Sequence, residues 1–267
     1  MEKDRYSTNT LTAVILLVYV IAFYVDKGVF TIPIHLGGFS LDVIVRTIDL
    51  IAPVSSLLVC CGMFELIAKN ERLSFEEKME HLILPFAAAW GLGMAFRNTG
   101  SGWTWWVILV FGGVLLNLIF TSECILCDPN DPREQLTEIM ITGLSYAAIL
   151  FFFIVVRANI IRLASILPLE MIASFMISIR IFSIWFQNHS ILIPSMIVSL
   201  IVTEASAVLH YYPLNAVSYG LFLFILFYSL ENIEIQLQKD IPLKKAFGNQ
   251  LPIMILFTFL FALTAIK

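Results

Sequence analysis

The strongest constraint on folding is a series of long apolar segments that recur along the whole chain. Each is about 16–24 residues long, and a helix of about 20 apolar residues crosses the roughly 30 Å hydrocarbon core of a bilayer. The segments are apolar on every face, whereas strands of a membrane barrel alternate polar and apolar residues over about 10 positions. Backbone groups in lipid must be paired within the protein, so these segments are predicted to be transmembrane helices.

The composition supports this class. Hydrophobic residues make up 59% of the chain and charged residues 13%, against about 45–50% and about 25% in soluble domains. The mean hydropathy is +0.89, and a soluble fold could not bury that much apolar surface. The same figures exclude disorder, a coiled coil and a disulfide-rich secreted module. We therefore predict an all-α, polytopic integral membrane bundle.

The apolar segments predict one transmembrane domain over residues 1–267, with about nine helices, a range of about eight to ten, and no soluble domain. The first segment is preceded by mixed charges and is not followed by a small-residue cleavage site, so we interpret it as a retained span rather than a signal peptide. The predicted spans lie near residues 9–25, 46–68, 79–96, 103–122, 136–156, 165–187, 191–210, 214–230 and 251–266.

Two helix starts carry local signals. Ser74 and Glu77 have the spacing of a capping box, which predicts a helix running into the third span. Asp131, Pro132 and Glu134 are predicted to be the N-cap, N1 and N3 residues of the fifth span.

The distribution of Lys and Arg predicts the orientation. With the N-terminus inside, the inner segments hold more basic residues than the outer ones, which favours a cytoplasmic N-terminus and an outside C-terminus in a plasma or inner membrane. Arg157 and Arg162 fall on the unfavoured side, so an additional or missing span before residue 157 stays open. The net charge of −4 gives no reason to expect nucleic acid as a partner. The expected partners are the lipid bilayer and, in one hypothesis below, another membrane subunit.

Ionisable groups inside spans are expensive in lipid and are the first candidates for function. Asp42, Arg46 and Asp49 have the spacing to meet on one helical face near the headgroups, where an exposed self-paired turn is the favoured interpretation. Glu65 lies four residues before Lys69, and the same interpretation applies. The full set within the predicted spans is Arg46, Asp49, Glu65, Glu170, Arg180, Glu204 and His210.

Two spans carry polar stripes. Glu170, Ser174 and Ser178 follow one another at every fourth position of the sixth span, and Arg180 lies off this stripe. Hydroxyl residues at such spacing indicate either close helix packing with interhelical hydrogen bonds or a polar transport path. On the seventh span, one arc of the helix holds Ser195, Ser199, Thr203, Ser206 and His210.

Glu204 points away from the polar arc of the seventh span, toward an apolar face deep in the membrane. A carboxylate at that depth cannot face lipid cheaply while ionised. Three resolutions are open: the group is protonated, it pairs with Arg180 on the preceding span, or it pairs with a cation from another subunit.

Metal and catalytic signals are sparse. Cys124 and Cys127 form a CxxC in the predicted loop before the fifth span, but a structural zinc site needs four ligands, and Cys60 and Cys61 are adjacent residues in mid-span. The CxxC is therefore only a weak metal candidate, with incidental thiols, redox or metal chemistry through a partner, and a disulfide all open. Neither HExxH, GxSxG nor a P-loop motif occurs, so the sequence identifies no cofactor and no catalytic residue.

Three functions are compatible with these features. The favoured hypothesis is a non-catalytic subunit or assembly partner of a membrane complex. The first alternative is a small permease or channel-like carrier that uses the polar faces of the sixth and seventh spans. The second alternative is an intramembrane enzyme that modifies a lipid, which would require Glu204, His210 and Tyr211 or Tyr212 to converge.

Overall fold

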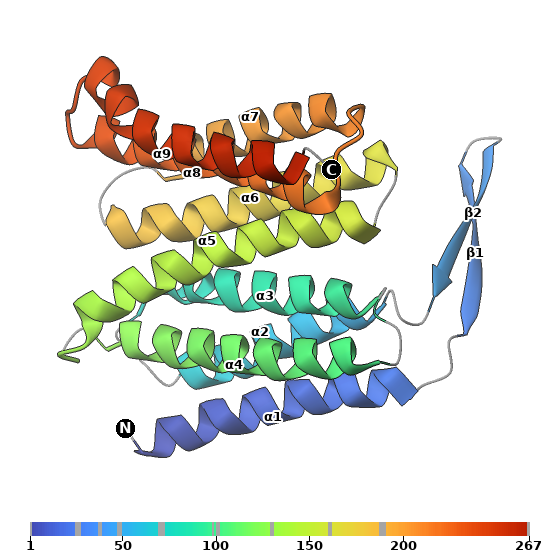
Figure 1. Ribbon diagram of the computed structural model, residues 1–267. Coiled ribbons are helices and arrows are strands. Elements are labelled where there is room, and N and C mark those ends of the chain that lie inside the picture. Colours follow the sequence, from blue (N-terminus) through green and yellow to red (C-terminus); the bar gives the residue numbers. More distant parts are fainter. Residues whose placement is uncertain are drawn as a thin grey trace. The chain divides into compact units, whose positions relative to one another are not determined.

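The chain is almost entirely helical in the computed structural model (Figure 1). The structure describes residues 2–24, 28–36, 39–46, 50–68, 73–97, 99, 102–128, 131–159, 162–186 and 191–265. Within these ranges, the elements are α1 (Glu2–Tyr24), β1 (Val29–Leu36), β2 (Phe39–Arg46), α2 (Ile51–Ala68), α3 (Phe75–Arg97), α4 (Trp103–Leu126), α5 (Glu134–Asn159), α6 (Leu163–Trp185), α7 (Leu192–His210), α8 (Ala216–Gln238) and α9 (Leu243–Ala265).

Each predicted span corresponds to one helix. Among the described residues, 8 helices, α1 to α8, are long and apolar enough to cross a membrane. The predicted all-α, polytopic helical bundle is therefore confirmed. The helix start at Phe75, directly after Ser74, agrees with the predicted capping signal, whereas α5 begins at Glu134, which was predicted to be its third residue.

Several predicted spans were shorter than the helices observed or began at the wrong residue. The second span begins at Ile51 rather than near residue 46. The fourth helix continues to Leu126 and the eighth to Gln238, and the ninth begins at Leu243. These extra turns contain polar residues, which lower local hydropathy without stopping a helix.

A two-stranded hairpin precedes α2. Strands β1 and β2 pair antiparallel, with Val29 opposite Arg46 and Leu36 opposite Phe39. Both strands are rich in the β-branched and aromatic residues that favour extended structure.

The hairpin corrects one prediction. Asp42 and Arg46 lie in β2, so the expected helical face that they were to share with Asp49 was wrong. Asp49 itself lies outside the described residues. Glu65 is exposed on α2, as expected for an interfacial group, but its predicted partner Lys69 also lies outside the described residues.

The chain divides into two compact units, so the single domain over residues 1–267 stays a prediction. The first unit comprises residues 1–74 and 85–127, and the second comprises residues 75–84 and 128–267. Helix α3 therefore contributes its first ten residues to the second unit and the remainder, from Pro85, to the first.

The first unit is held together by packing of α1 against α2 and α4. Tyr19 of α1 is fully enclosed, and its hydroxyl lies 3.0 Å from Ser55 Oγ of α2 and 2.9 Å from the Ala89 carbonyl oxygen of α3. On the other side of α1, Asn117 Nδ2 of α4 donates to Asn9 Oδ1 at 2.8 Å. Pairing of the buried Tyr19 hydroxyl fixes the position of α1 against α2 and α3 in this unit, and the bond between Asn117 and Asn9 is exposed.

Close approach of α2 and α3 requires a glycine at position 93. A Cβ atom at Gly93 would lie 2.5 Å from Ala52 Cα and 2.8 Å from Ala52 Cβ. Because backbone must move to relieve this overlap, we expect Gly93→Ala to lower the free energy of unfolding by about 1–3 kcal/mol. Thermal unfolding in detergent measures the loss. The control is Gly143→Ala, where the added Cβ meets nothing within 4 Å, and equal melting temperatures for the two variants would contradict the close approach.

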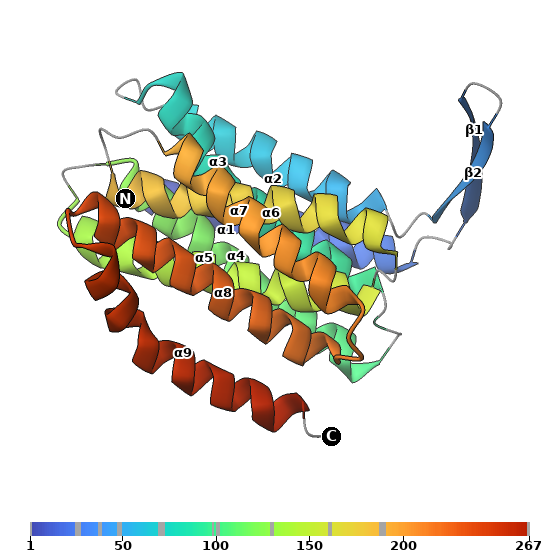
Figure 2. The ribbon, with the colours of Figure 1, turned by 90° about the horizontal axis from the view of Figure 1, so that it is seen from above.

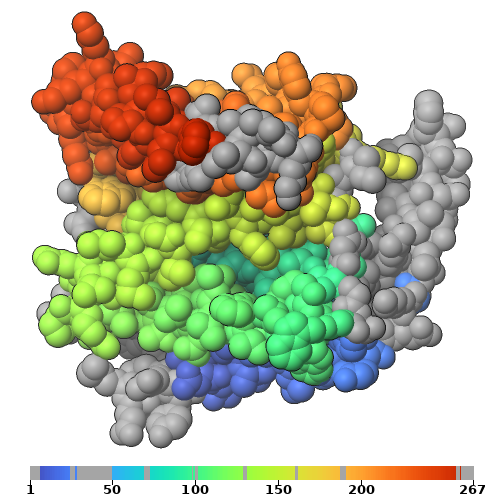
Figure 3. Space-filling model, in the orientation of Figure 1, coloured from blue at the N-terminus to red at the C-terminus, as the bar shows by residue number. Residues whose placement is uncertain are grey.

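The second unit contains α5 to α9. Helix α6 packs against α5 and α7, α8 packs against α7 and α5, and α6 also meets α8, which gives a four-helix arrangement (Figures 1 and 2). Helix α9 packs against α8 at the surface of this unit, red in Figure 3, and leaves Leu251, Ile255 and Phe259 exposed. Such exposure is expected for a helix that faces lipid.

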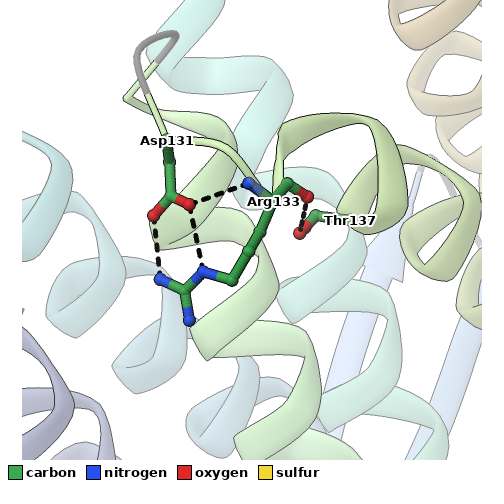
Figure 4. A network of polar contacts seen from close by, with 3 residues as sticks. All are labelled: Asp131, Arg133 and Thr137. Atoms are coloured by element: carbon green, nitrogen blue, oxygen red, sulfur yellow. Dashed lines mark hydrogen bonds and ion pairs between the residues drawn. The ribbon is translucent and has the colours of Figure 1, made fainter.

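The segment before α5 is ordered by a charged turn (Figure 4). Asp131 Oδ1 accepts hydrogen bonds from Arg133 N and Nε, both at 3.0 Å, and Asp131 Oδ2 accepts one from Arg133 Nη2 at 2.8 Å. Thr137 Oγ1 donates to the Arg133 carbonyl oxygen at 2.8 Å. These bonds connect the turn to the first turn of α5.

Hydrogen bonds from Arg133 lower the pKa of Asp131 from 3.8 to about 2. A depressed pKa in the folded state means that the stabilisation is present above the unfolded pKa and is lost as the pH falls toward about 2. We therefore expect Asp131→Asn to lower stability slightly at neutral pH and to converge with wild type in acid. Melting temperatures of both proteins across this pH range measure the effect, and a constant difference would contradict it.

Candidate functional site

A buried polar cluster joins three helices of the second unit around Glu170. The Tyr219 hydroxyl of α8 lies 3.1 Å from both Glu170 Oε1 and Oε2 of α6. The same hydroxyl lies 2.7 Å from Ser206 Oγ of α7. All three side chains have 0% relative exposure. The Glu170 carboxyl is therefore held in a fixed position inside the protein by hydroxyl groups rather than by an ion pair.

Arg157 extends this cluster from α5. Its Nη1 lies 3.0 Å from His210 Nδ1 of α7, and its guanidinium carbon lies 5.0 Å from the centre of the Tyr219 ring. An arginine donates and cannot accept, so His210 Nδ1 is the acceptor and the imidazole is neutral when this bond forms. Arg157 also acts electrostatically on Glu170. The cluster thus places a half-buried cation next to a buried carboxyl.

This cluster lies toward one end of the four-helix arrangement. Arg157 and His210 belong to the last turns of α5 and α7, and Tyr219 to the first turn of α8. Glu170 is seven residues into α6, which is about 10 Å along the helix from Leu163. The carboxyl therefore lies roughly two turns below the end of the bundle.

A second fully buried carboxyl belongs to Glu231 of α8. It has 0% relative exposure, and neither Oε1 nor Oε2 has a hydrogen-bond partner among the described residues. Tyr146 of α5 interacts with it electrostatically, and the Ser178 hydroxyl of α6 lies near it without meeting the geometry of a hydrogen bond. Tyr146 is in turn 3.4 Å from Asn232 Nδ2. Glu231 is therefore an uncompensated carboxyl in the interior of the unit.

The predicted stripe on α6 connects the two carboxyls. Ser174 and Ser178 follow Glu170 on one face of the helix, and all three side chains have 0% relative exposure. Within the part of the chain that the structure describes, neither serine hydroxyl has a hydrogen-bond partner. Tyr219, which binds Glu170, and Glu231 are twelve residues apart on α8, or about 18 Å along the helix axis. We call Glu170, Ser174, Ser178 and Glu231 the polar track.

The polar stripe on α7 has a different character. Ser195 Oγ, Ser199 Oγ and Thr203 Oγ1 each donate to a carbonyl oxygen of the preceding turn, at 2.7, 2.9 and 2.7 Å. These hydroxyls are satisfied within their own helix, and small side chains allow α6 and α7 to pack closely. Ser206 departs from this pattern because it contacts Tyr219. The packing interpretation therefore fits most of α7, whereas it leaves the α6 hydroxyls unexplained.

Arg180 is buried on another side of α6. Its Nη2 lies 3.2 Å from His81 Nδ1 of α3, and its Nη1 donates to Ser183 Oγ at 3.3 Å. Glu80, half-buried beside His81, interacts electrostatically with the same guanidinium. Of the three resolutions left open for Glu204, the pair with Arg180 was therefore wrong: the guanidinium of Arg180 is turned toward the first turns of α3.

Glu204 is exposed on α7. Its neighbours on that face include Met196, Leu200 and Val208, which are 51%, 41% and 62% exposed. His210, by contrast, contacts the half-buried side chain of Arg157. Glu204 and His210, which a lipid-modifying site would need to bring together, therefore lie in different environments. Glu204 instead presents a carboxyl on an exposed, largely apolar surface of α7.

The cysteine pair was predicted to lie in a loop, and this prediction was wrong. Cys124 belongs to the last turn of α4, and Cys127 directly follows that helix. Within the described chain, none of the four cysteines forms a disulfide. Among the residues that the structure describes, no group of three or more His, Cys, Asp or Glu side chains could hold a metal ion.

Sequence reasoning missed several residues of these clusters. Arg157 and Glu231 were assigned to connections because the predicted spans ended too early. Tyr219 and His81 were not considered because no spacing rule links them to Glu170 or Arg180. For Glu231 a signal was present, since buried apolar residues at Phe227 and Ile235 continue the same helix on either side of it.

Comparison with known proteins places the chain in a family without assigning an activity. A family model described as "Protein of unknown function (DUF5656)" matches residues 28–265. No curated protein and no solved structure matches the chain. Because the family model covers α2 to α9 and the hairpin, the chain belongs to the DUF5656 family.

Proposed function

We propose that the chain is a small permease or channel-like carrier that moves a cation along the polar track between α6 and α8. One observation carries this proposal: Glu170 and Glu231 are fully buried in one unit, and the serine hydroxyls between them are also buried and without partners. Ionisable groups in membrane helices commonly belong to ion pathways or proton relays.

The energetic cost of the polar track supports transport over packing. Burying a hydroxyl without a hydrogen bond costs about 1–3 kcal/mol on scales from protein mutations, and an unpaired carboxylate costs more. A structural core avoids this cost with apolar side chains of similar size. Three consecutive turns of α6 instead keep Glu170, Ser174 and Ser178. A passing cation or its water would supply the partners that these groups lack.

In this proposal the Glu170 end of the polar track receives the cation. Glu170 provides the negative charge that receives the cation, and Tyr219 and Ser206 hold its carboxyl in place. Arg157 lies beside Glu170 and competes electrostatically with the cation. That competition keeps binding weak enough for release, which conduction requires.

Ion flux in liposomes tests the proposal. The purified full-length protein is reconstituted, and the entry of H⁺ and of ²²Na⁺ is measured under an imposed membrane potential. We expect one of the two fluxes to exceed that of protein-free liposomes. The Glu65→Gln variant is the matched control, because Glu65 is an exposed carboxyl of α2 that lies outside the track. Rates equal to those of protein-free liposomes for both ions would contradict the proposal.

A second function, as a non-catalytic subunit or assembly partner of a membrane complex, is favoured by Glu204. An exposed carboxyl among exposed apolar side chains of α7 suits a partner helix that carries a cationic side chain. Purification from the native membrane in mild detergent, followed by mass analysis, tests it. We expect a stoichiometric partner with wild type and Glu65→Gln but not with Glu204→Gln, and recovery of the same protein with all three would contradict the role of this residue.

We also propose the orientation that the basic residues predict, with the N-terminus cytoplasmic and the C-terminus outside in a plasma membrane. Single cysteines in a cysteine-free background test it through an impermeant thiol reagent added to intact cells. Tyr211→Cys, after α7, is expected to react from outside, and Pro242→Cys, before α9, only after lysis. The reverse pattern would contradict the orientation.

A further inference from the structure

We propose that Glu231, together with the Ser178 hydroxyl of α6, forms a second binding site for a small monovalent cation, Na⁺ or a proton. The inference rests on the proposed cation path and deepens it by assigning a site far from Glu170. It also makes a claim about binding that does not require any flux.

The burial of Glu231 points to a ligand. Its carboxyl has 0% relative exposure, and neither oxygen has a hydrogen-bond partner among the described residues. The Ser178 hydroxyl beside it is equally buried and also lacks a partner. Three oxygen atoms from two helices thus lie close together, and none of them makes a hydrogen bond of good geometry within the described part of the chain, although buried polar groups in native proteins are nearly always paired.

Charge balance selects a monovalent ion. The acidic group that faces Glu231 from its own helix is half-buried Glu234, Tyr146 faces it from α5, and Ser178 faces it from α6. A single buried carboxylate is neutralised by one positive charge, whereas a divalent ion would leave an uncompensated charge in the interior. Carboxylate and hydroxyl oxygens are hard ligands that suit Na⁺, and a proton satisfies the same carboxyl directly.

Ser174 gives this site a connection to Glu170. It lies one turn from each of Glu170 and Ser178 on α6, with about 6 Å of helix axis per step. Its hydroxyl is buried and has no partner within the described part of the chain. A cation that leaves Glu170 therefore meets oxygen ligands at successive turns until it reaches Glu231.

Thermal unfolding of the purified full-length protein in detergent tests the site, with NaCl compared against choline chloride at equal ionic strength. If the ligand is Na⁺, we expect the melting temperature of wild type to rise by several degrees at saturating Na⁺. In the Glu170→Gln background, which removes the proposed cation site at the other carboxyl, we expect a Na⁺ shift to remain, and the added Glu231→Gln substitution is expected to abolish it. Ser178→Ala, which keeps the carboxyl, is expected to raise the half-saturating Na⁺ concentration about tenfold.

If the ligand is a proton, Na⁺ has no effect, and infrared spectra of Glu170→Gln show a protonated carboxyl band that is absent when Glu231→Gln is added. The inference is overturned if Glu170→Gln shows neither the Na⁺ shift nor this band, or if either persists when Glu231→Gln is added. If the protein binds the cation at Glu231 but shows no flux in liposomes, the binding site is supported and the proposed transport function is contradicted. The failure of one proposal can therefore be distinguished from the failure of the other.

Discussion

Glu170→Gln is expected to reduce the initial rate of cation flux more than tenfold, which corresponds to about 1.4 kcal/mol or more of lost stabilisation along the path. Glutamine keeps the size of the side chain and accepts the hydrogen bond from Tyr219, but it removes the negative charge. The Tyr219 hydroxyl and Ser206 Oγ would stay in place. We therefore expect the melting temperature of this variant to lie close to that of wild type.

Tyr219→Phe separates charge from positioning. It keeps Glu170 but removes the hydroxyl that lies 3.1 Å from both carboxyl oxygens. We expect a smaller loss of flux than in Glu170→Gln, because the charge remains while its position is less fixed. The control is Glu65→Gln, with wild-type flux expected. Full flux in Glu170→Gln would show that the cation does not use this carboxyl.

Arg180→Met is expected to destabilise the second unit by about 2–4 kcal/mol, because removing one partner of a buried charged cluster leaves the others unpaired. Arg180 is 3% exposed and bonds His81 of α3 and Ser183 of its own helix. Glu80 would lose its neighbouring cation, but its half-exposed position allows water to offset part of the loss. The expected value therefore lies below that of a fully enclosed ion pair.

The matched control is Arg162→Met, since Arg162 is exposed at the start of α6. Thermal unfolding of both variants in the same detergent measures the difference, and each kcal/mol corresponds to a shift of about 2–4 °C for a chain of this size. A melting temperature for Arg180→Met that matches that of Arg162→Met would mean that the contact between α3 and α6 contributes little.

The helical class was predictable because apolar length is a direct consequence of bilayer thickness. All nine predicted spans fall on helices of the described chain. The hairpin was missed because the search for spans treated residues 26–45 as a connection. A signal was available there, since Gly37 and Gly38 stand between two segments rich in β-branched residues.

The stripe of Glu170, Ser174 and Ser178 was predictable because the spacing of four residues fixes a helical face. Its burial was not, because spacing says which residues share a face and not what that face contacts. For the same reason the surroundings of Glu204 were left open between three resolutions, and the structure shows it exposed on α7.

Partners across helices were beyond sequence reasoning. Arg180 was paired in prediction with the adjacent α7, yet its contact is His81 of α3, 99 positions away in the sequence. Tyr219 bonds Glu170 across 49 positions. Such pairs depend on the rotation and depth of each helix, which local periodicity does not determine.

The central claim is that cations pass between the two buried carboxyls, and Ser174 lies midway along that path. The most direct test is the reaction of Ser174→Cys, in a cysteine-free background, with a cationic thiol reagent during flux in liposomes. We predict that the reagent reacts and blocks flux, and that Tyr211→Cys, exposed beyond α7, reacts without loss of flux. An unreactive Ser174→Cys, in a protein whose flux continues in the presence of the reagent, would contradict the proposed path.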